Sequence, residues 1–119
     1  MSLSVKRLGV VLDGHALVDD FSIELQAGRV HAVVGESGSG KTLSALAVLG
    51  LGPEGATVRG SAVRGGVELL TAAAPLRRAG LAMVLQEPLS ALNPVLSVGA
   101  QLLETLSVLI QVFFFKRFK

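Results

Sequence analysis

Residues 35–42 read Gly-Glu-Ser-Gly-Ser-Gly-Lys-Thr, so three glycines and two serines precede one lysine and one threonine. Glycines let a backbone curl until several N–H groups point at one centre, which is what a chain of phosphates requires. The ammonium group of Lys41 can then reach β- and γ-phosphates, and the hydroxyl of Thr42 can bind the accompanying Mg²⁺. The spacing G-x-x-x-x-G-K-[ST] therefore predicts a loop that binds a nucleoside triphosphate. The residues predicted to form it are Gly35, Glu36, Ser37, Gly38, Ser39, Gly40, Lys41 and Thr42.

The flanking sequence decides between this prediction and a flexible Gly/Ser linker that contains Gly-Lys-Thr by chance. RVHAVVG ends in the apolar run Ala32–Val34, which is typical of a parallel strand covered on both faces. Residues 42–51 are rich in leucine and alanine and predict a helix, which Gly52-Pro53 would stop. A loop between a buried strand and a helix favours phosphate binding, because the helix presents free N–H groups and its positive dipole end to the anion.

The remaining elements follow from alternation and turn residues. Residues 3–12 and 21–27 predict two strands joined by the turn-rich stretch DGHALVDD, and residues 57–70 predict a weak hairpin. Residues 71–80 suit a helix or a loop, and LAMVLQ, residues 81–86, predicts a second apolar strand. EPLSALNPVLSVG is expected to form a structured loop, with a helix that begins near Ser97.

Composition bounds the class of protein. The chain has 119 residues, half of them hydrophobic, which suits one domain, and it has no cysteine for disulfides, thiol catalysis or thiolate metal sites. The net charge of +2 depends on Lys116, Arg117 and Lys119, and the other eight basic residues face nine acidic ones. No basic stripe indicates nucleic acid, no secretory signal is expected, and no apolar run approaches the roughly 20 residues that span a bilayer.

Two stretches resemble a known family. QAGRVHAVVGESGSGKTLSALAVLGL, residues 26–51, resembles the phosphate-loop segment of ATP-binding cassette (ABC) transporter subunits, and LAMVLQEPLSALNPVLSVGAQLLE, residues 81–104, resembles their glutamine-loop region. Gln86-Glu87-Pro88, the run from Ala91 to Pro94 and Val98-Gly99 look like the di- and oligopeptide (or nickel) importer branch. The resemblance covers residues 1–104. It implies an incomplete α/β P-loop NTPase fold, with an N-terminal antiparallel β subdomain, the phosphate-loop strand and helix, and the glutamine-loop strand.

The resemblance also implies an activity and partners. ATP and Mg²⁺ would be bound by residues 35–42, and Gln86 would reach toward Mg²⁺ and the attacking water while its loop touches a membrane subunit. The alternative for Gln86 is a surface glutamine that closes a strand. Expected partners are membrane permease subunits, a second ATP-binding subunit and, indirectly, an extracytoplasmic solute-binding protein. The chain would lie peripherally on the cytoplasmic face of the membrane and couple ATP hydrolysis to solute uptake.

The sequence departs from the family in three respects. Residues 1–20 contain no aromatic side chain to stack on adenine, and His15 is better explained as a surface turn residue. The family's signature loop, its acidic Walker B strand with the catalytic glutamate and its switch histidine follow the glutamine loop, and none is present here. We therefore expect the chain to retain nucleotide binding more readily than nucleotide hydrolysis. The alternative function is a catalytically inert nucleotide-binding remnant of a frameshifted or truncated gene.

The third departure is the end of the chain. Residues 105–119, TLSVLIQVFFFKRFK, are interpreted as an aberrant apolar and basic tail after a partial ATP-binding domain at residues 1–104. A membrane-surface anchor is the alternative for this tail. Because the two predicted parallel strands would lack neighbours, the chain alone is expected to be insoluble or molten.

Overall fold

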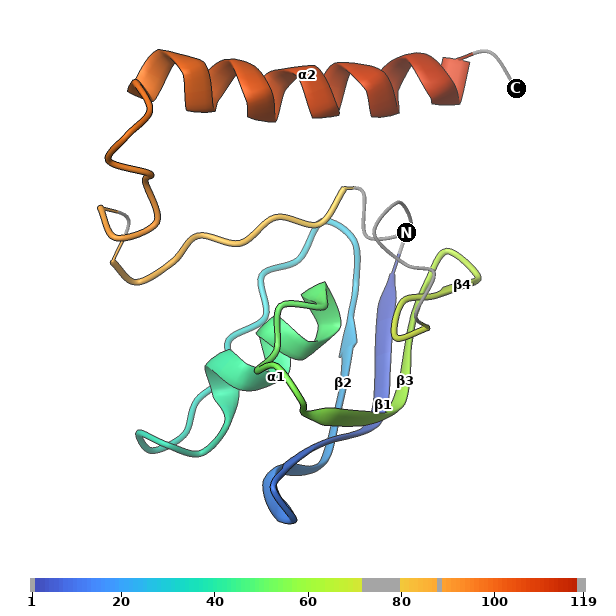
Figure 1. The fold of residues 1–119 in the computed structure, drawn as a ribbon. Helices are drawn as coiled ribbons and strands as arrows, with labels where there is room; N and C mark the ends of the chain where they lie inside the picture. The colour runs from blue at the N-terminus through green and yellow to red at the C-terminus, as the bar shows by residue number, and fades with distance from the viewer. Residues whose placement is uncertain (1, 72–79, 88, 118–119) are drawn as a thin grey trace. The chain divides into compact units, whose positions relative to one another are not determined.

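A computed structural model describes residues 2–71, 80–87 and 89–117. The chain divides into two compact units, Met1–Arg78 and Ala79–Lys119. The first unit contains a four-stranded antiparallel sheet in the order β2-β1-β3-β4 and the helix α1 (Figure 1). The strands are β1 (Leu3–Leu12), β2 (His15–Leu25), β3 (Thr57–Arg64) and β4 (Val67–Glu68), and α1 is Lys41–Leu49.

β1 and β2 form a hairpin whose turn is only Asp13-Gly14. Both residues have positive φ, 49° and 76°, as the commonest two-residue hairpin turn requires. The two strands were predicted, but the long connection DGHALVDD was wrong, because β2 already begins at His15. The alternation of exposed Leu17 with buried Val18 belongs to this strand, and the pair Asp19-Asp20 hid that pattern.

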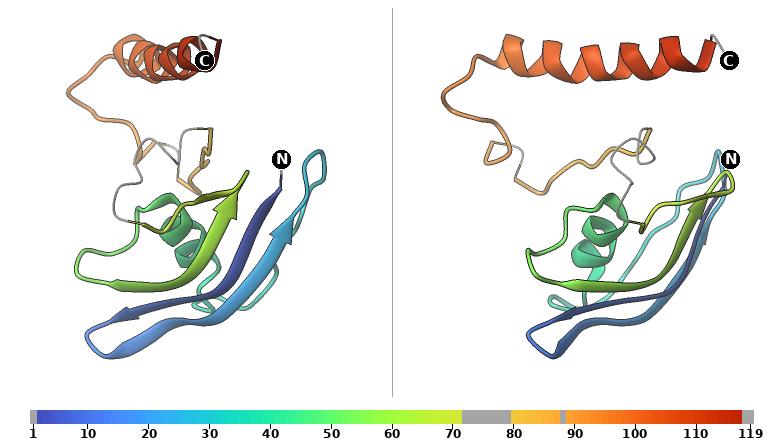
Figure 2. Two further views of the ribbon diagram at one scale, coloured as in Figure 1. Left: turned by 90° about the vertical axis from the view of Figure 1, so that its right-hand side faces the viewer. Right: turned by 45° about the vertical axis from the view of Figure 1, so that its right-hand side comes forward.

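The three long strands bend where their register shifts (Figure 2). Arg7 and Asp20 both have φ near 50°, which is uncommon for residues with a side chain. On the other side of β1, Gly60 has φ 101°, and a Cβ atom there would lie 2.5 Å from the carbonyl oxygen of Arg7. Only glycine fits at this position. Bulged residues on β1, β2 and β3 therefore lie next to one another, and together they form the bend of the sheet.

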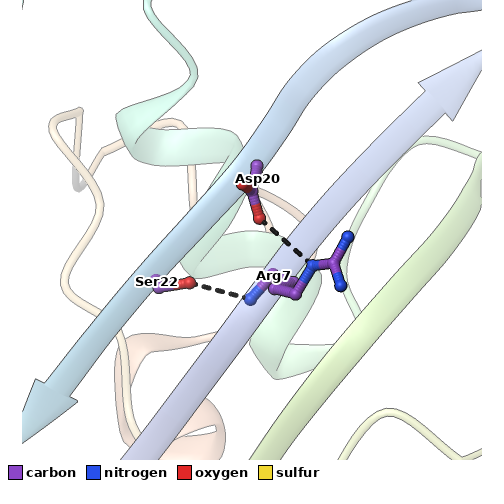
Figure 3. Close-up of polar contacts among 3 residues, drawn as sticks. All are labelled: Arg7, Asp20 and Ser22. Atoms are coloured by element: carbon purple, nitrogen blue, oxygen red, sulfur yellow. Dashed lines mark hydrogen bonds and ion pairs between the residues drawn. The ribbon is translucent and has the colours of Figure 1, made fainter.

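Side chains bridge the same bend (Figure 3). The Arg7 N–H donates a 2.9 Å hydrogen bond to Ser22 Oγ, and Arg7 Nε lies 3.6 Å from Asp20 Oδ1. Both charged side chains are well exposed, so the ion pair contributes little stability, and the hydrogen bond that satisfies the bulged N–H matters more.

The core of this unit lies between the sheet and α1, on the concave side of the sheet (Figure 2). Its buried apolar residues are Val5, Leu8, Val10, Val18, Ala47, Val48, Ala62 and Leu69. The predicted helix at residues 42–51 is confirmed, although it ends at Leu49. Gly50 then adopts φ 73°, and its N–H bonds to Ala47 O while Leu51 N bonds to Leu46 O, which closes the helix C-terminus.

The predicted hairpin at residues 57–70 is confirmed as β3 and β4, and the Glu68 carboxylate holds it together. Glu68 Oε2 accepts a 2.6 Å hydrogen bond from Ser61 Oγ, and Oε1 accepts bonds from Ala62 N and Leu70 N at 2.9 and 3.0 Å. Burial of this carboxyl raises its pKa, but the hydrogen bonds from Ser61, Ala62, Leu70 and Leu69 outweigh burial. The pKa of Glu68 therefore lies below its ordinary value.

Two predicted strands are wrong. Residues 29–34 and 81–86 contain no strand, Val30 is fully exposed, and Val34 and Val84 are exposed by 91% and 92%. A parallel strand takes its backbone hydrogen bonds from neighbouring strands and buries both faces. No strand of the described residues pairs with either segment, so their apolar sequence is not enough to make them strands. Of the segment 71–80, residues 72–79 lie outside the described part of the chain.

The second unit contains the helix α2 (Val98–Arg117) and the turns that precede it. The structured loop predicted at residues 87–99 is confirmed for residues 89–97, while Pro88 lies outside the described residues and residues 98–99 belong to α2. The predicted helix start near Ser97 is also confirmed, since Ser97 Oγ accepts a hydrogen bond from Ala100 N. Helix α2 runs without a break across residues 104 and 105. The domain boundary placed there stays a prediction. Among the described residues, no helix combines the length and the hydropathy needed to cross a bilayer.

Candidate phosphate-binding site

Residues 35–40 form a curled loop that leads directly into α1. Ser39 N donates a 3.2 Å hydrogen bond to Glu36 O, which closes a turn, and Gly38 and Gly40 have φ values of 80° and 88°. These left-handed conformations are easily reached only by glycine. Residues 35–39 are all exposed, so their backbone is accessible to a ligand from solvent.

Lys41, the first residue of α1, folds back over this loop. Its Nζ atom donates hydrogen bonds of 2.6 Å to Gly35 O, 2.6 Å to Glu36 O and 3.2 Å to Ser39 Oγ. A single ammonium group therefore joins the start of the loop to its end. It is the positive charge that a phosphate chain would meet at this point.

The N-terminus of α1 adds backbone donors to the same place. The first hydrogen bond that closes the helix runs from Ser44 N to Gly40 O at 2.8 Å, and Ser44 Oγ donates to the same oxygen. Within the described part of the chain, no acceptor pairs with the N–H groups of Lys41, Thr42 and Leu43, and Gly40 has no side chain to cap them. Three free donors at the positive end of a helix are a ready site for an anion.

Steric constraints explain why glycine occupies two fixed positions of the phosphate-loop motif, Gly35 and Gly40. A Cβ atom at Gly40 would lie 3.0 Å from Val18 Cγ2 and 3.1 Å from Leu17 O, so the loop sits directly on β2. At Gly35 a Cβ atom would lie 2.8 Å from Ser39 Oγ, which contacts Lys41. The close packing on β2 holds the entry to α1 in place, and larger residues would push the loop off the sheet.

The donor set fits a triphosphate with Mg²⁺. ATP would be held through its phosphates by the loop amides, the helix N-terminus and Lys41, and the exposed Thr42 hydroxyl would be available to the metal. No group of three or more His, Asp or Glu side chains among the described residues could bind a metal by itself.

The structure brings together the predicted residues 35–42 within the first compact unit. Gln86 is exposed and lies in the second compact unit, so its role at the metal stays a prediction. His15 is exposed, and its Nδ1 lies 3.0 Å from Asp13 O beside the hairpin turn, as expected of a surface turn histidine.

Sequence reasoning missed the residues that support the site. Leu17 and Val18 of β2 lie under Gly40. In the second unit, Gln101 was not singled out, although its amide bonds to the backbone of Asn93 and to Leu96 O and so fixes the loop before α2. No local sequence signal identifies these contacts, because they join residues that are distant in sequence or look like ordinary helix residues.

A glycine-rich loop that leads into a helix with these donors is typical of the P-loop NTPase class, and the comparisons with known proteins name the family. The profile of the ABC transporter family matches residues 18–114. The chain belongs to the ABC transporter family.

Curated relatives come from one branch of that family. The oligopeptide transport ATP-binding proteins OppD of Mycobacterium tuberculosis and Escherichia coli are 46% and 39% identical to the chain over 95 and 112 residues, which are 76% and 87% of the chain. The nickel import ATP-binding protein NikD of Brucella abortus is 43% identical over 102 residues, or 83% of the chain. The aligned part spans only 16%, 33% and 38% of these three relatives, respectively.

Proposed function

We propose that the chain binds Mg²⁺-ATP through residues 35–42 and forms part of the ATP-binding subunit of an oligopeptide or nickel importer. The observation that carries this proposal is the arrangement around Lys41. Its ammonium group and the free N–H groups at the start of α1 surround one exposed loop. The relatives described above, which are oligopeptide and nickel transport ATP-binding proteins, supply the importer branch.

Each residue of the loop has a proposed task. Backbone N–H groups from Gly38 to Thr42 bind phosphate oxygens, Lys41 neutralises the β- and γ-phosphates, and the Thr42 hydroxyl binds Mg²⁺. The carbonyl contacts of Lys41 must be exchanged for phosphate contacts when ATP binds. Until then, these contacts keep the loop curled and its amides accessible, so that little reorganisation is needed on binding.

The larger activity belongs to an assembly. The proposed partners are membrane permease subunits, a second ATP-binding subunit and, indirectly, a solute-binding protein, with the chain peripheral on the cytoplasmic face. Gln86 is proposed to link the metal site to a permease subunit. Hydrolysis is proposed to need a signature loop and a general base from other polypeptide segments, since this sequence contains neither motif.

Hydrogen exchange with and without Mg²⁺-ATP tests the proposed site. Because ATP would contact the loop amides and the free N–H groups of Lys41, Thr42 and Leu43, the amides of residues 38–43 are expected to exchange more slowly in its presence. The hairpin of β3 and β4, which has no proposed contact with ATP, serves as the internal control and should not change. Equal exchange of residues 38–43 with and without nucleotide, at ATP concentrations in the millimolar range, would rule out the proposed site.

A further inference from the structure

The segment that leads from β2 into the phosphate-binding loop is attached to the sheet at few points. Its residues 29–34 are all exposed (Figure 1). Within the described part of the chain, two hydrogen bonds tie this segment to the end of β2, and both involve Gln26. Arg29 N donates to Gln26 O at 3.3 Å, and Gln26 N donates to His31 Nε2 at 3.1 Å. The loop is therefore packed firmly on β2 at its end, Gly40, and held lightly where it begins.

The hydrogen bond from Gln26 fixes the chemical state of the His31 ring. A backbone N–H can only donate, so Nε2 must be the ring nitrogen without a proton, and the imidazole must be neutral. An imidazolium ring carries a proton on both nitrogens and has no acceptor left. When His31 gains a proton, the Gln26 N–H and the new Nε2–H point at each other, and the bond is lost. Histidine side chains ordinarily change their charge between about pH 5 and about pH 8, so this loss falls within the physiological range.

The other histidine of the chain forms a hydrogen bond of the opposite kind. His15 Nδ1 lies 3.0 Å from Asp13 O, and a carbonyl oxygen can only accept, so this ring nitrogen is the donor. Nδ1 keeps its proton when the ring becomes charged, and this bond therefore survives protonation. Both histidines are exposed. The chain thus contains one histidine whose hydrogen bond depends on pH and a matched one whose hydrogen bond does not.

The charged side chains on the segments next to His31 offer its imidazolium form no partner. They are Glu24 on β2, Lys6 on β1, Arg29 in the turn and Glu36 in the loop. None of these four described residues forms an ion pair with the ring. A carboxylate at hydrogen-bond distance would hold the imidazolium in the same place. Without one, protonation removes an attachment of the segment and supplies no replacement.

We propose that His31 is a pH-sensitive latch on the phosphate-binding loop. The neutral ring holds residues 29–34 to the end of β2 and keeps the start of the loop in place, whereas the charged ring releases them. Release increases the backbone freedom that Mg²⁺-ATP must remove when it binds, so the affinity falls with the pH. The effect on ATP rests on the function proposed above, while the latch itself is a property of the chain without nucleotide.

Hydrogen exchange of the Gln26 amide tests the latch without nucleotide. Exchange is measured at about pH 8 and about pH 5 and is expressed relative to the intrinsic rate of an unstructured amide at the same pH. Protection should fall roughly two- to tenfold at the lower pH, as expected for the loss of one hydrogen bond. His31→Phe should show the low protection at both pH values, and His15→Phe should keep the pH dependence of the unchanged chain.

The outcome for the unchanged chain decides whether the latch exists. The amide of Leu69, which bonds to Ala62 O in the hairpin of β3 and β4, reports whether the fold is intact and should keep its protection throughout. Equal protection of Gln26 at both pH values overturns the proposal. A pH dependence that persists in His31→Phe overturns it as well, because another group would then be responsible.

The affinity for Mg²⁺-ATP tests the effect on the loop. His31→Phe should bind Mg²⁺-ATP roughly two- to tenfold more weakly than the unchanged chain at the higher pH, and the two should bind equally at the lower pH. Comparison of the two chains at one pH cancels the protonation of ATP itself. His15→Phe should match the unchanged chain at both pH values.

The two possible failures can be told apart. If the unchanged chain and His31→Phe bind Mg²⁺-ATP equally at the higher pH, the latch does not act on the loop and the proposal is wrong. If the unchanged chain binds no Mg²⁺-ATP at the higher pH, the proposed function is wrong, and the exchange of Gln26 then decides the latch by itself.

Discussion

Lys41 has two tasks that use the same ammonium group. In this structure its ammonium group ties Gly35 O, Glu36 O and Ser39 Oγ together, so the loop is already curled without a ligand. When a phosphate binds, the same charge is proposed to move to the anion. A loop that is closed by its own lysine lowers the ordering cost of binding, since little of the backbone must be rearranged.

Gly38 and Gly40 differ in the space that the fold leaves for a side chain, which gives a first prediction. Gly40→Ala places a Cβ atom 3.0 Å from Val18 Cγ2 at a φ of 88°, whereas Gly38→Ala meets no atom within 4 Å at a φ of 80°. Both substitutions carry the left-handed penalty of roughly 1–2 kcal/mol, and only Gly40→Ala adds a clash with β2. Gly40→Ala is therefore expected to lower the free energy of unfolding more than Gly38→Ala, as measured by denaturant titration. Equal losses would show that β2 does not hold the loop.

Much of the site at this scale was predictable, because the motif is local. The spacing of Gly35, Gly40, Lys41 and Thr42 indicates phosphate binding by itself, and the rest of the fold is not needed for that prediction. The contact between Gly40 and Val18 was not predictable, since it depends on how β2 crosses under the start of α1. Gln86 was predicted from the family resemblance alone, and its distance from the loop cannot be read from the order of residues.

At the scale of elements, the hairpin of β3 and β4 depends on a charged group. The Glu68 carboxylate accepts hydrogen bonds from Ser61 Oγ and from the N–H groups of Ala62 and Leu70, in a hairpin whose second strand has only two residues. So short a strand offers few ladder hydrogen bonds, and the carboxylate supplies acceptors that the ladder lacks. The hairpin in turn brings Leu69 into the core.

The lowered pKa of Glu68 gives a prediction about pH. A carboxyl whose folded pKa lies below its unfolded value, about 4.3, stabilises the fold above pH 4.3. That contribution is lost as the pH falls through the folded pKa, because the unfolded chain takes up the proton first. Glu68→Gln should therefore flatten the fall in unfolding free energy below about pH 4.3, as followed by circular dichroism. Glu24→Gln on β2, which is exposed, should leave the fall unchanged, and an unchanged fall in Glu68→Gln would refute the carboxylate's role.

The elements that the sequence predicted well are those with local signals. The strands of the two hairpins follow from alternation, and α1 follows from its leucine and alanine content, whereas the tight turn at Asp13-Gly14 was not predicted. Residues 29–34 and 81–86 have the composition of parallel strands, but a parallel strand exists only beside its neighbours. The composition of these two segments indicates that they are suited to be parallel strands. It does not show whether neighbouring strands are present among the described residues.

At the scale of the whole molecule, many large apolar side chains of the described residues are exposed. Val30, Val34 and Val84 lie in segments without strand partners, and Leu89 and Val95 are also exposed. The chain spans between 16% and 38% of the lengths of the three relatives described above. Surfaces of this kind, next to unpaired backbone groups, favour association with other chains.

The exposed apolar side chains predict that the chain aggregates, and charged substitutions at these positions should reduce the aggregation. Val30→Lys together with Val84→Lys should raise the soluble fraction of the expressed chain, because both side chains are exposed and neither contributes to the core. The matched control, Val10→Lys, changes a fully buried residue of β1 and should lower solubility by disrupting the fold. A soluble monomeric chain with a sharp cooperative melt, before any substitution, would show that the exposed segments do not govern association.

The most direct measurement of the central claim is a nucleotide titration that compares Lys41→Ala with the unchanged chain. Loss of the ammonium group is expected to weaken Mg²⁺-ATP binding roughly 10- to 100-fold, which is typical of a hydrogen-bonded charge. Lys6→Ala removes a lysine of β1 that lies outside the loop and should leave the affinity unchanged. Equal affinity of the unchanged chain and Lys41→Ala would contradict the assignment of residues 35–42 as the phosphate-binding loop.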